Sequence, residues 1–378
     1  MSDERLRVCI GGGGGFIGSH LARRLVEQGH WVRCVDWAEN TYFATDEFFN
    51  EFVLGDLRDP DVCRRAVDGC DWVFNMAADM GGMVRVLACA CGHSDARAGC
   101  ARAGAQGFIM SNAATLMHNN ALIDTQLIEA ARQAGVKRYF YASSACVYPA
   151  RMQESTQAIS LCESYAGAGE PEDDYGFEKR WGERVALAYG KDFEGFEVRV
   201  GRFHNIYGPQ GTWRGGREKV PAAFCRKALT SDETFEVWGD GEQTRSFCFV
   251  DDCVDGVLRL MRSDCSEPLN IGSDELVSMN DLARLAIELA GRTLELRHVK
   301  GPQGVRGRNS DNTLIRKRLD WAPSITLKDG LQRTMCWIDA QLQQERAAGV
   351  NVEAEYAKSR VVQMRTPEAG GGAQGVRE

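Results

Sequence analysis

Short apolar runs alternate with longer amphipathic stretches along the first half of the chain. The runs are rich in β-branched and aromatic residues, which favours buried strands, and the stretches between them have apolar residues at helical spacing. Strands or strand ends are predicted at residues 7–10, 31–35, 53–57, 72–79, 138–142 and 197–200. Helices are predicted at residues 19–28, 113–133 and 175–189. This alternation predicts an α/β fold with a parallel, doubly wound sheet.

The pattern changes after residue 210 to loops and shorter elements. It predicts a helix at 221–229, a strand and turn at 234–241, a strand at 246–250 with a helix to residue 261, and helices at 279–290 and 327–347. We therefore expect a nucleotide-binding domain at 1–209 and a smaller C-terminal α/β substrate domain at 210–365. Residues 245–262 should return to the first domain. The polar, glycine-rich tail 366–378 is expected to be disordered.

A glycine run follows the first predicted strand. Gly12, Gly15 and Gly18 fit the pattern G-x-x-G-x-x-G, with Phe16 and Ile17 between the last two. Glycines permit a tight turn and close approach of the backbone to a pyrophosphate at a helix N-terminus. A strand before the run and a helix after it argue against a flexible linker. The run predicts a Rossmann domain.

An acidic residue, Asp36, ends the second predicted strand. A carboxylate at this place accepts hydrogen bonds from both ribose hydroxyls and repels a 2′-phosphate, so NAD is favoured over NADP. Asp56 is placed to meet the adenine amino group, with Leu57 beside it. Ala77 belongs to a strand-end loop expected to lie along the cofactor.

The net charge and the cysteine content indicate which binding partners and which cellular compartment to expect. The chain has 378 residues, and 45 basic against 53 acidic residues give a net charge of −8. An acidic chain disfavours nucleic acid and anionic membranes. The 14 cysteines are scattered without a C-x-x-C pair, and we identify neither a signal peptide nor an apolar run of membrane-spanning length. These features predict a cytoplasmic protein with free thiols.

A second signature lies where the fifth predicted strand ends. Ser144, Ala145 and Cys146 follow that strand, and Tyr175 with Lys179 forms a Tyr-x-x-x-Lys motif. The i,i+4 spacing places phenol and ammonium on one helix face. A nearby cation favours the phenolate, so the motif predicts a lowered pKa for Tyr175 and a base usable near neutrality. Alone, such a pair is often a solvated surface pair; the glycine run favours catalysis.

Residues 84–106 interrupt the pattern. Of these 23 residues, 16 are Ala, Gly, Cys or Arg, without helical or strand periodicity. Three interpretations stay open: a surface loop; a metal site using Cys89, Cys91, His93 and Cys100, whose spacing matches no standard zinc pattern; or a retained in-frame intron bounded by a valine codon (GT) and a glutamine codon (AG). We favour the intron and predict no metal.

These motifs resemble the extended short-chain dehydrogenase/reductase superfamily of sugar-nucleotide epimerases and dehydratases. Five stretches, 77–83, 143–149, 201–209, 215–219 and 304–311, resemble more narrowly the GDP-mannose 3,5-epimerases of plants and green algae. The resemblance covers roughly residues 6 to 365 and stops only at the segment 84–106. It implies GDP-mannose and GDP-L-galactose as substrate and product, bound NAD, and a homodimer. It also implies a role in L-ascorbate and cell-wall sugar synthesis, with GDP-L-gulose as the C5-only product.

The implied chemistry is a temporary oxidation. Tyr175 takes the proton of the C4 hydroxyl, Ser144 hydrogen-bonds the C4 oxygen, and Lys179 holds ribose and phenol. A 4-ketone then acidifies the protons on C3 and C5. The resemblance implies Cys146 as base and Lys219 as acid for the inversions.

Substrate contacts come partly from charge and partly from resemblance. Lys227, Arg245 and Arg308 are candidate cations for the diphosphate. The resemblance adds the contacts Gly81, Ser144, Ala145, Cys146, Asn205, Glu218, Lys219, Gln243, Thr244 and Ser359.

Two alternative functions are also compatible with the fold. An epimerase/reductase resembling GDP-fucose synthase would consume NADPH and use a histidine acid, against which Asp36 and Lys219 argue. A catalytically inactive nucleotide-sensing relative is disfavoured by the intact Tyr175, Lys179 and Cys146, although the segment 84–106 could inactivate this form.

Overall fold

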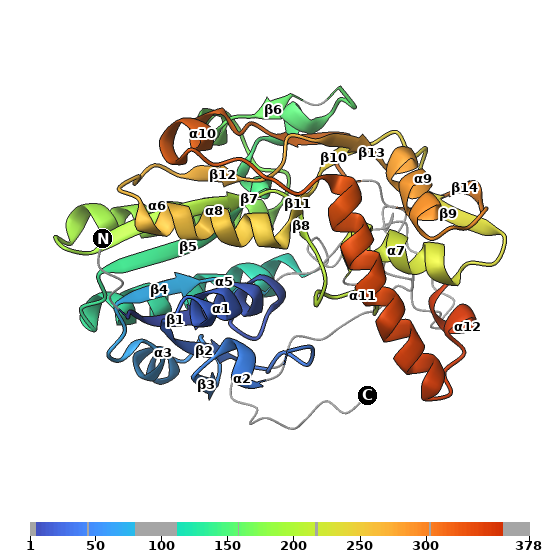
Figure 1. Cartoon of the computed structure of the whole chain (residues 1–378). Coiled ribbons are helices and arrows are strands. Elements are labelled where there is room, and N and C mark those ends of the chain that lie inside the picture. Colours follow the sequence, from blue (N-terminus) through green and yellow to red (C-terminus); the bar gives the residue numbers. More distant parts are fainter. Residues whose placement is uncertain are drawn as a thin grey trace, which may run out of the picture.

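The structure, a computed structural model, describes residues 5–43, 45–79, 112–157, 159–215, 218–301 and 304–357. A parallel seven-stranded sheet forms its larger part (Figure 1). In spatial order the strands are β12 (Leu269–Ile271), β7 (Glu197–Phe203), β5 (Arg138–Ser144), β4 (Trp72–Asn75), β1 (Arg7–Gly11), β2 (Trp31–Asp36) and β3 (Glu51–Leu54). The predicted doubly wound α/β fold is confirmed.

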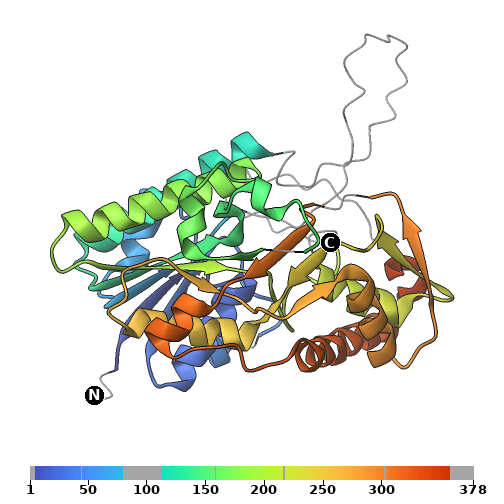
Figure 2. The same cartoon turned by 90° about the horizontal axis from the view of Figure 1, so that it is seen from above.

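Helices cover both faces of this sheet (Figure 2). One face carries α3 (Pro60–Val67), α5 (Ala113–Gln133) and α6 (Asp174–Asp192), and the other carries α1 (Phe16–Glu27), α2 (Thr45–Phe48) and α8 (Val250–Arg262). The central strands are apolar and buried almost throughout, as a sheet covered on both faces requires. Helix α6 begins after Asp173, whose side chain accepts a hydrogen bond from the Gly176 N–H at 2.8 Å.

The strand order reverses between β1 and β4. From β1 the chain proceeds outward through β2 and β3, whereas β4, β5, β7 and β12 follow on the other side. Ligands of doubly wound sheets bind beyond the carboxyl ends of the strands at such a switch point. The glycine run after β1 and the loop after β4 meet there.

A smaller group of elements lies beside the sheet. It contains a four-stranded sheet of β13 (Leu276–Ser278), β10 (Thr244–Ser246), β15 (Gly307–Ser310) and β6 (Ser160–Leu161). Two strand pairs add β11 (Cys248–Phe249) with β8 (Ile206–Tyr207), and β14 (Glu295–Val299) with β9 (Thr234–Trp238). The helices of this group are α7 (Val220–Thr230), α9 (Met279–Leu289), α11 (Leu327–Ala347) and α12 (Val352–Tyr356), whereas α10 (Thr313–Leu319) packs against β12 of the large sheet. Short 3₁₀ turns are η1 (Ala145–Val147), η2 (Ala150–Gln153) and η3 (Glu163–Gly167).

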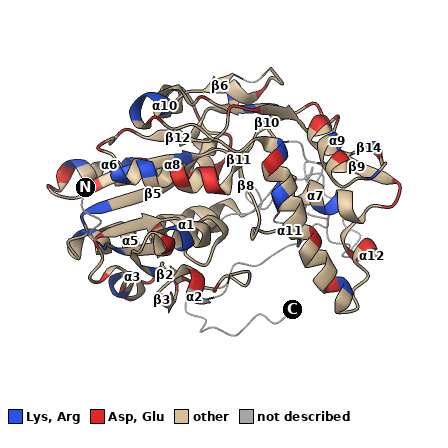
Figure 3. Cartoon of the chain, in the orientation of Figure 1, with Lys and Arg blue, Asp and Glu red and all other residues tan. Residues whose placement is uncertain are grey.

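Two segments from the second half of the chain join the large sheet. Helix α8 packs against α1 and β7, and β12 pairs with β7 as the outermost strand. Acidic residues occupy the first turn of α8 and basic residues its last turn, which complements the helix dipole (Figure 3). The sequence pattern missed β12 because three residues are too short to show a period.

Several sequence-based expectations fall outside the described residues. These are the segment 84–106, the candidate contacts Gly81 and Ser359, and the tail 366–378. Among the helices that the structure does describe, none combines the length and apolarity needed to cross a membrane.

Candidate active site

The glycine run forms a close-packed turn between β1 and α1. Gly12 has a φ of +79°, and a Cβ there would lie 2.7 Å from the Ala77 backbone nitrogen. A Cβ on Gly18 would lie 2.1 Å from the Gly12 carbonyl oxygen. Gly15 is the N-cap of α1 and has no side chain with which to cap it, which leaves the first N–H groups of that helix for a ligand. This backbone cradle fits a pyrophosphate, as the sequence predicted.

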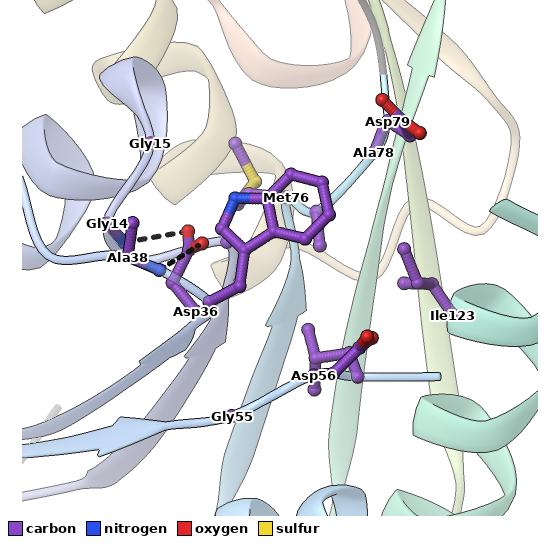
Figure 4. Close-up of a pocket in the computed structure, with 14 residues that line it drawn as sticks. Gly14, Gly15, Asp36, Ala38, Gly55, Asp56, Met76, Ala78, Asp79 and Ile123 are labelled. Carbon is purple, nitrogen blue, oxygen red and sulfur yellow. Dashed lines mark hydrogen bonds between the residues drawn. The ribbon is translucent and has the colours of Figure 1, made fainter. Parts of the chain in front are cut away.

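Asp36 is the acidic partner of this cradle (Figure 4). Its Oδ2 accepts a hydrogen bond from the Gly14 N–H at 3.1 Å, and its Oδ1 accepts one from the Ala38 N–H at 3.4 Å. Burial raises the pKa of Asp36 to about 6, although these N–H groups act against it. The carboxylate is therefore charged at neutral pH and loses its charge as the pH falls through about 6.

The crevice between the strand ends has the lining that a dinucleotide needs. Gly12, Gly14, Gly15, Asp36, Trp37, Ala38, Gly55, Asp56, Leu57, Met76, Ala77, Ala78, Asp79 and Ile123 line it. It brings together most of the cofactor contacts predicted from the sequence. Asp79 belongs to the loop that was expected to lie along the cofactor. Trp37 and Ile123 were missed; for Trp37, an aromatic residue directly after the acid was an available signal.

Asp56 reaches the crevice with a partner of its own. Arg58 donates to Asp56 from its Nε and Nη2, at 2.9 and 2.5 Å from Oδ2. Burial alone would raise the pKa of Asp56, but the bonds from Arg58 outweigh it and the pKa is lowered. Asp56 is therefore a fixed carboxylate beside the predicted adenine position.

An Asp36→Asn variant should bind NAD about tenfold more weakly, because a neutral amide replaces a charged hydrogen-bond acceptor. It should also reject NADP less strongly, since the repulsion of a 2′-phosphate is gone. Calorimetric titration with both dinucleotides measures the change. Asp255→Asn, on the exposed surface of α8, is the matched control. An unchanged ratio of NAD to NADP affinity would show that Asp36 does not contact the ribose.

Tyr175 and Lys179 lie on the buried face of α6, as their spacing predicted. The Lys179 ammonium is 5.9 Å from the centre of the Tyr175 ring and donates to the Tyr141 hydroxyl at 3.2 Å. It is also 3.5 Å from Glu178 Oε1 and 3.8 Å from Asp124 Oδ2. The cation is thus shared with two carboxylates that the motif does not reveal.

The structure differs from the expected pKa of Tyr175. Burial raises that pKa well above its usual range, and the negative charges of Cys146 and Glu178 act in the same direction. In this structure the ammonium does not reverse the effect, because it is neutralised by its acidic neighbours. A base at Tyr175 therefore depends on the charge of the whole cluster rather than on Lys179 alone.

The serine and cysteine signature turns sharply at the end of β5. The Cys146 N–H donates to Ser144 Oγ at 3.2 Å, at the start of η1. The hydroxyl of Ser143 instead donates to Glu183 at 2.5 Å, away from this turn. Gly176 packs against the turn so closely that a Cβ there would lie 2.2 Å from the Cys146 carbonyl oxygen. Ser144, Cys146 and the start of the Tyr175 helix therefore form one packed unit.

A guanidinium from the second half of the chain faces the thiol. The Nη1 of Arg308 lies 3.5 Å from the Cys146 sulfur, while its Nε donates to Gln153 at 2.5 Å. Its Nη2 lies 3.3 Å from a Glu172 carboxylate oxygen. A cation within contact distance of the sulfur is a typical neighbour of reactive cysteines.

Lys219 belongs to the same electrostatic group. Desolvation lowers its pKa and Arg308 adds to the decrease, whereas the Cys146 thiol acts in the opposite direction. Part of the residue nevertheless remains exposed to solvent. A lysine with a lowered pKa gives up its proton more readily, as an acid in the predicted inversion requires.

Arg245 and Arg308 are neighbours in register on the parallel strands β10 and β15. Burial lowers the pKa of Arg245, and the charge of Arg308 lowers it further. Arg245 donates to the carbonyl oxygens of Thr244 and Val305 at 2.7 and 2.6 Å. Two adjacent guanidiniums, one buried and one half-buried, favour an anionic ligand such as a diphosphate.

The other predicted substrate contacts lie in the smaller group of elements. Lys227 is buried, donates to the Glu236 carbonyl at 3.0 Å, and has its pKa lowered to about 8 by desolvation. Glu218 forms a buried ion pair with Arg226 at 2.7 Å. Gln243 donates to the Trp238 carbonyl, Thr244 to the Thr156 carbonyl, and Asn205, with a φ of +44°, to the Ser246 carbonyl.

Similarity to known proteins agrees with this geometry. The model of the NAD dependent epimerase/dehydratase family matches residues 8–88 and 85–272. GDP-mannose 3,5-epimerase 1 of Oryza sativa subsp. japonica is 53% identical, covering 96% of this chain and 89% of the rice protein. The chain belongs to the GDP-mannose 3,5-epimerase family. The Arabidopsis thaliana GDP-mannose 3,5-epimerase is 51% identical over 96% of this chain and 90% of its own length.

The fold of this GDP-mannose 3,5-epimerase homologue is also found in solved structures of other enzymes. UDP-glucose 4-epimerase of Thermotoga maritima superposes with a TM-score of 0.75 at 24% identity, covering 89% of this chain and 100% of the other. A more distant relative, UDP-glucuronic acid decarboxylase 1 of Xenopus tropicalis, is 29% identical over 90% of this chain and 74% of its own length. The shared fold therefore supports several reactions, and the site must decide among them.

Proposed function

We propose that this protein epimerises GDP-mannose at C3 and C5 to GDP-L-galactose through a transient 4-ketone, with GDP-L-gulose as the C5-only product. The observation that carries the proposal is the Cys146 sulfur facing Arg308 on the turn that also holds Ser144. A simple 4-epimerisation needs no second base. A thiol beside a cation, near the tyrosine that takes the C4 hydroxyl proton, supplies such a base. The relatives at 51–53% identity are named for the same activity.

The lining of the crevice at the glycine run fits NAD, which would supply a reversible hydride acceptor for C4 of the sugar, so no net redox is expected. The backbone at Gly12, Gly15 and Gly18 would hold its pyrophosphate, and Asp36 would hold its ribose. Tyr175 removes the C4 hydroxyl proton and returns it at the end, while Ser144 orients the C4 oxygen. Lys179 would hold the ribose of the cofactor, and its ammonium adds a positive charge near the Tyr175 phenol.

Cys146 and Lys219 carry out the inversions at C3 and C5. The 4-ketone acidifies both neighbouring C–H bonds because the carbanion delocalises as an enolate. Cys146 removes the proton from one face, and Lys219 delivers a proton to the other. Arg245, Arg308 and Lys227 bind the diphosphate or keep the nucleotide sugar in place. The role of Arg308 is then double, because it also contacts the thiol.

The wider assignments belong to this proposal as well. A homodimer is supported by Phe177 and Trp181, which lie four residues apart on α6 and are 49% and 39% exposed. The scattered free thiols favour a cytoplasmic place, and the resemblance to the plant and algal enzymes implies a role in L-ascorbate and cell-wall sugar synthesis.

The test is the product formed from GDP-mannose in deuterated water. Proton NMR should show GDP-L-galactose carrying deuterium at C3 and C5, with no consumption of NADH or NADPH. The full chain and a form lacking residues 84–106 should be assayed together. Activity in the shorter form alone would identify the segment as the inhibitory part. Inactivity of both forms, or net oxidation of NADPH, would contradict the proposal.

A further inference from the structure

A buried cluster of two carboxylates and one ammonium lies behind the catalytic tyrosine. Glu178, Asp124 and Lys179 are 2%, 4% and 1% exposed. The Lys179 Nζ lies 3.5 Å from Glu178 Oε1 and 3.8 Å from Asp124 Oδ2. The mechanism above uses Lys179 and gives the two acids no task. At full ionisation these three groups would carry a net charge of −1.

The two carboxylates differ in the number of hydrogen bonds that they accept. Asp124 Oδ1 accepts from Asn75 Nδ2 at 2.9 Å, and its Oδ2 accepts from the Tyr141 hydroxyl at 2.8 Å. Both oxygens therefore have donors, which suits an ionised carboxylate. Glu178 Oε2 accepts from Asn120 Nδ2 at 3.0 Å, but among the described residues Oε1 has no hydrogen-bond partner. An ionised, fully buried carboxylate is costly when it has one hydrogen bond and only a cation that it shares with Asp124.

Further charges around α6 do not correct this imbalance. On β7, Arg202 is bound at 2.7 and 2.8 Å by Glu183, so it is already neutralised. Within the described residues, the neutral titratable groups beside the cluster, Tyr175 on α6 and Tyr141 on β5, can each add negative charge only. Two acids that share one cation in a buried site retain one proton between them.

We propose that Glu178 holds this proton as a neutral carboxylic acid in the working enzyme, and that Glu178 thereby acts as a positioning residue that sets the charge felt by Tyr175. Burial raises the pKa of Glu178 to about 7, and the charge of Asp124 acts in the same direction. The inference rests on the proposed roles of Tyr175 and Lys179.

The direction of the pH effect follows from the charges. Above about pH 7, Glu178 ionises and the cluster becomes an anion. Its negative charge raises the pKa of Tyr175. Deprotonation of the phenol is then less favourable, so kcat should decrease as the pH rises through the ionisation of Glu178.

Glu178→Gln tests this directly, because the amide keeps an acceptor for Asn120 and stays neutral at every pH. Wild-type kcat should fall relative to that of the variant by about tenfold between about pH 6 and about pH 9, the effect of one pKa unit at Tyr175. Near pH 6 the two enzymes should have similar kcat. The infrared spectrum of the wild type should contain a protonated-carboxyl band that disappears over the same pH range and is missing in the variant.

Glu163→Gln is the matched control, since burial also raises the pKa of Glu163 but its carboxylate accepts from the Asn270 backbone, outside the cluster. It should keep the wild-type profile. If Glu178→Gln does not fold, Glu178→Asp replaces it. The shorter acid should keep the alkaline decrease at a displaced midpoint, and an unchanged midpoint would refute the inference.

The outcomes also separate this inference from the proposed function. A wild-type enzyme without epimerase activity would contradict the function itself. An active wild type whose pH profile and infrared band are the same in Glu178→Gln would overturn only the role of Glu178.

Discussion

Replacing Tyr175 by phenylalanine is expected to lower kcat on the order of 10³-fold, because general acid–base catalysis at C4 is lost while the ring still fills its buried site. Oxidation at C4 precedes every later step, so C3 and C5 exchange with solvent should be lost together. Binding of NAD and GDP-mannose should change little, which calorimetry can verify. Turnover is measured by NMR of the product.

Tyr189→Phe is the control for the loss of a hydroxyl on the same helix. The Tyr189 hydroxyl donates to Glu129 on α5 at 3.1 Å and lies outside the crevice. This variant should retain wild-type kcat. A Tyr175→Phe enzyme with undiminished turnover would mean that the C4 proton is removed by another group, and the proposed route through a ketone would have to be abandoned.

Cys146→Ala should separate oxidation from epimerisation. Without the thiol the C5 proton has no base, so deuterium incorporation at C5 should fall by about 10²- to 10⁴-fold. The tyrosine, serine and lysine remain, so GDP-mannose should still bind and its C4 should still be oxidised reversibly. Mass spectrometry of the recovered sugar nucleotide measures the exchange.

Cys162→Ala is the control, because Cys162 is partly exposed and its sulfur lies 3.1 Å from the Ser164 hydroxyl rather than in the site. It should exchange hydrogen at the wild-type rate. Undiminished C5 exchange in Cys146→Ala would remove the thiol from the mechanism and would direct attention to Glu172, the carboxylate that shares Arg308 with it.

The sequence was sufficient for the parts of the site built from neighbours in the chain. The glycine turn, Asp36 at the end of β2, and the Tyr175–Lys179 pair each combine local geometry with a recognisable spacing. The helices were found within a few residues, because each has an apolar face several turns long. Helices α5 and α11 have the bounds that were predicted.

Contacts between distant segments were not predictable in this way. Arg308 was assigned to the diphosphate by its charge, but its place beside the Cys146 sulfur depends on the pairing of β15 with β6 and β10. Strands of two to four residues show no period from which such pairing can be read. The acids around Lys179 were missed because Asp124 lies 55 residues earlier on a helix whose apolar pattern hides it. Burial raises the pKa of Tyr175, and these acids act in the same direction, so the predicted lowering of that pKa was wrong.

The contact of Gly176 with the Cys146 carbonyl has a consequence for the order of events. The backbone that carries Tyr175, which acts at C4, is packed directly against the backbone that carries Cys146, which acts at the neighbouring carbons. In the proposed reaction, the hexose can therefore remain in a single pose while successive atoms react, and no repositioning of the ligand has to separate the stages.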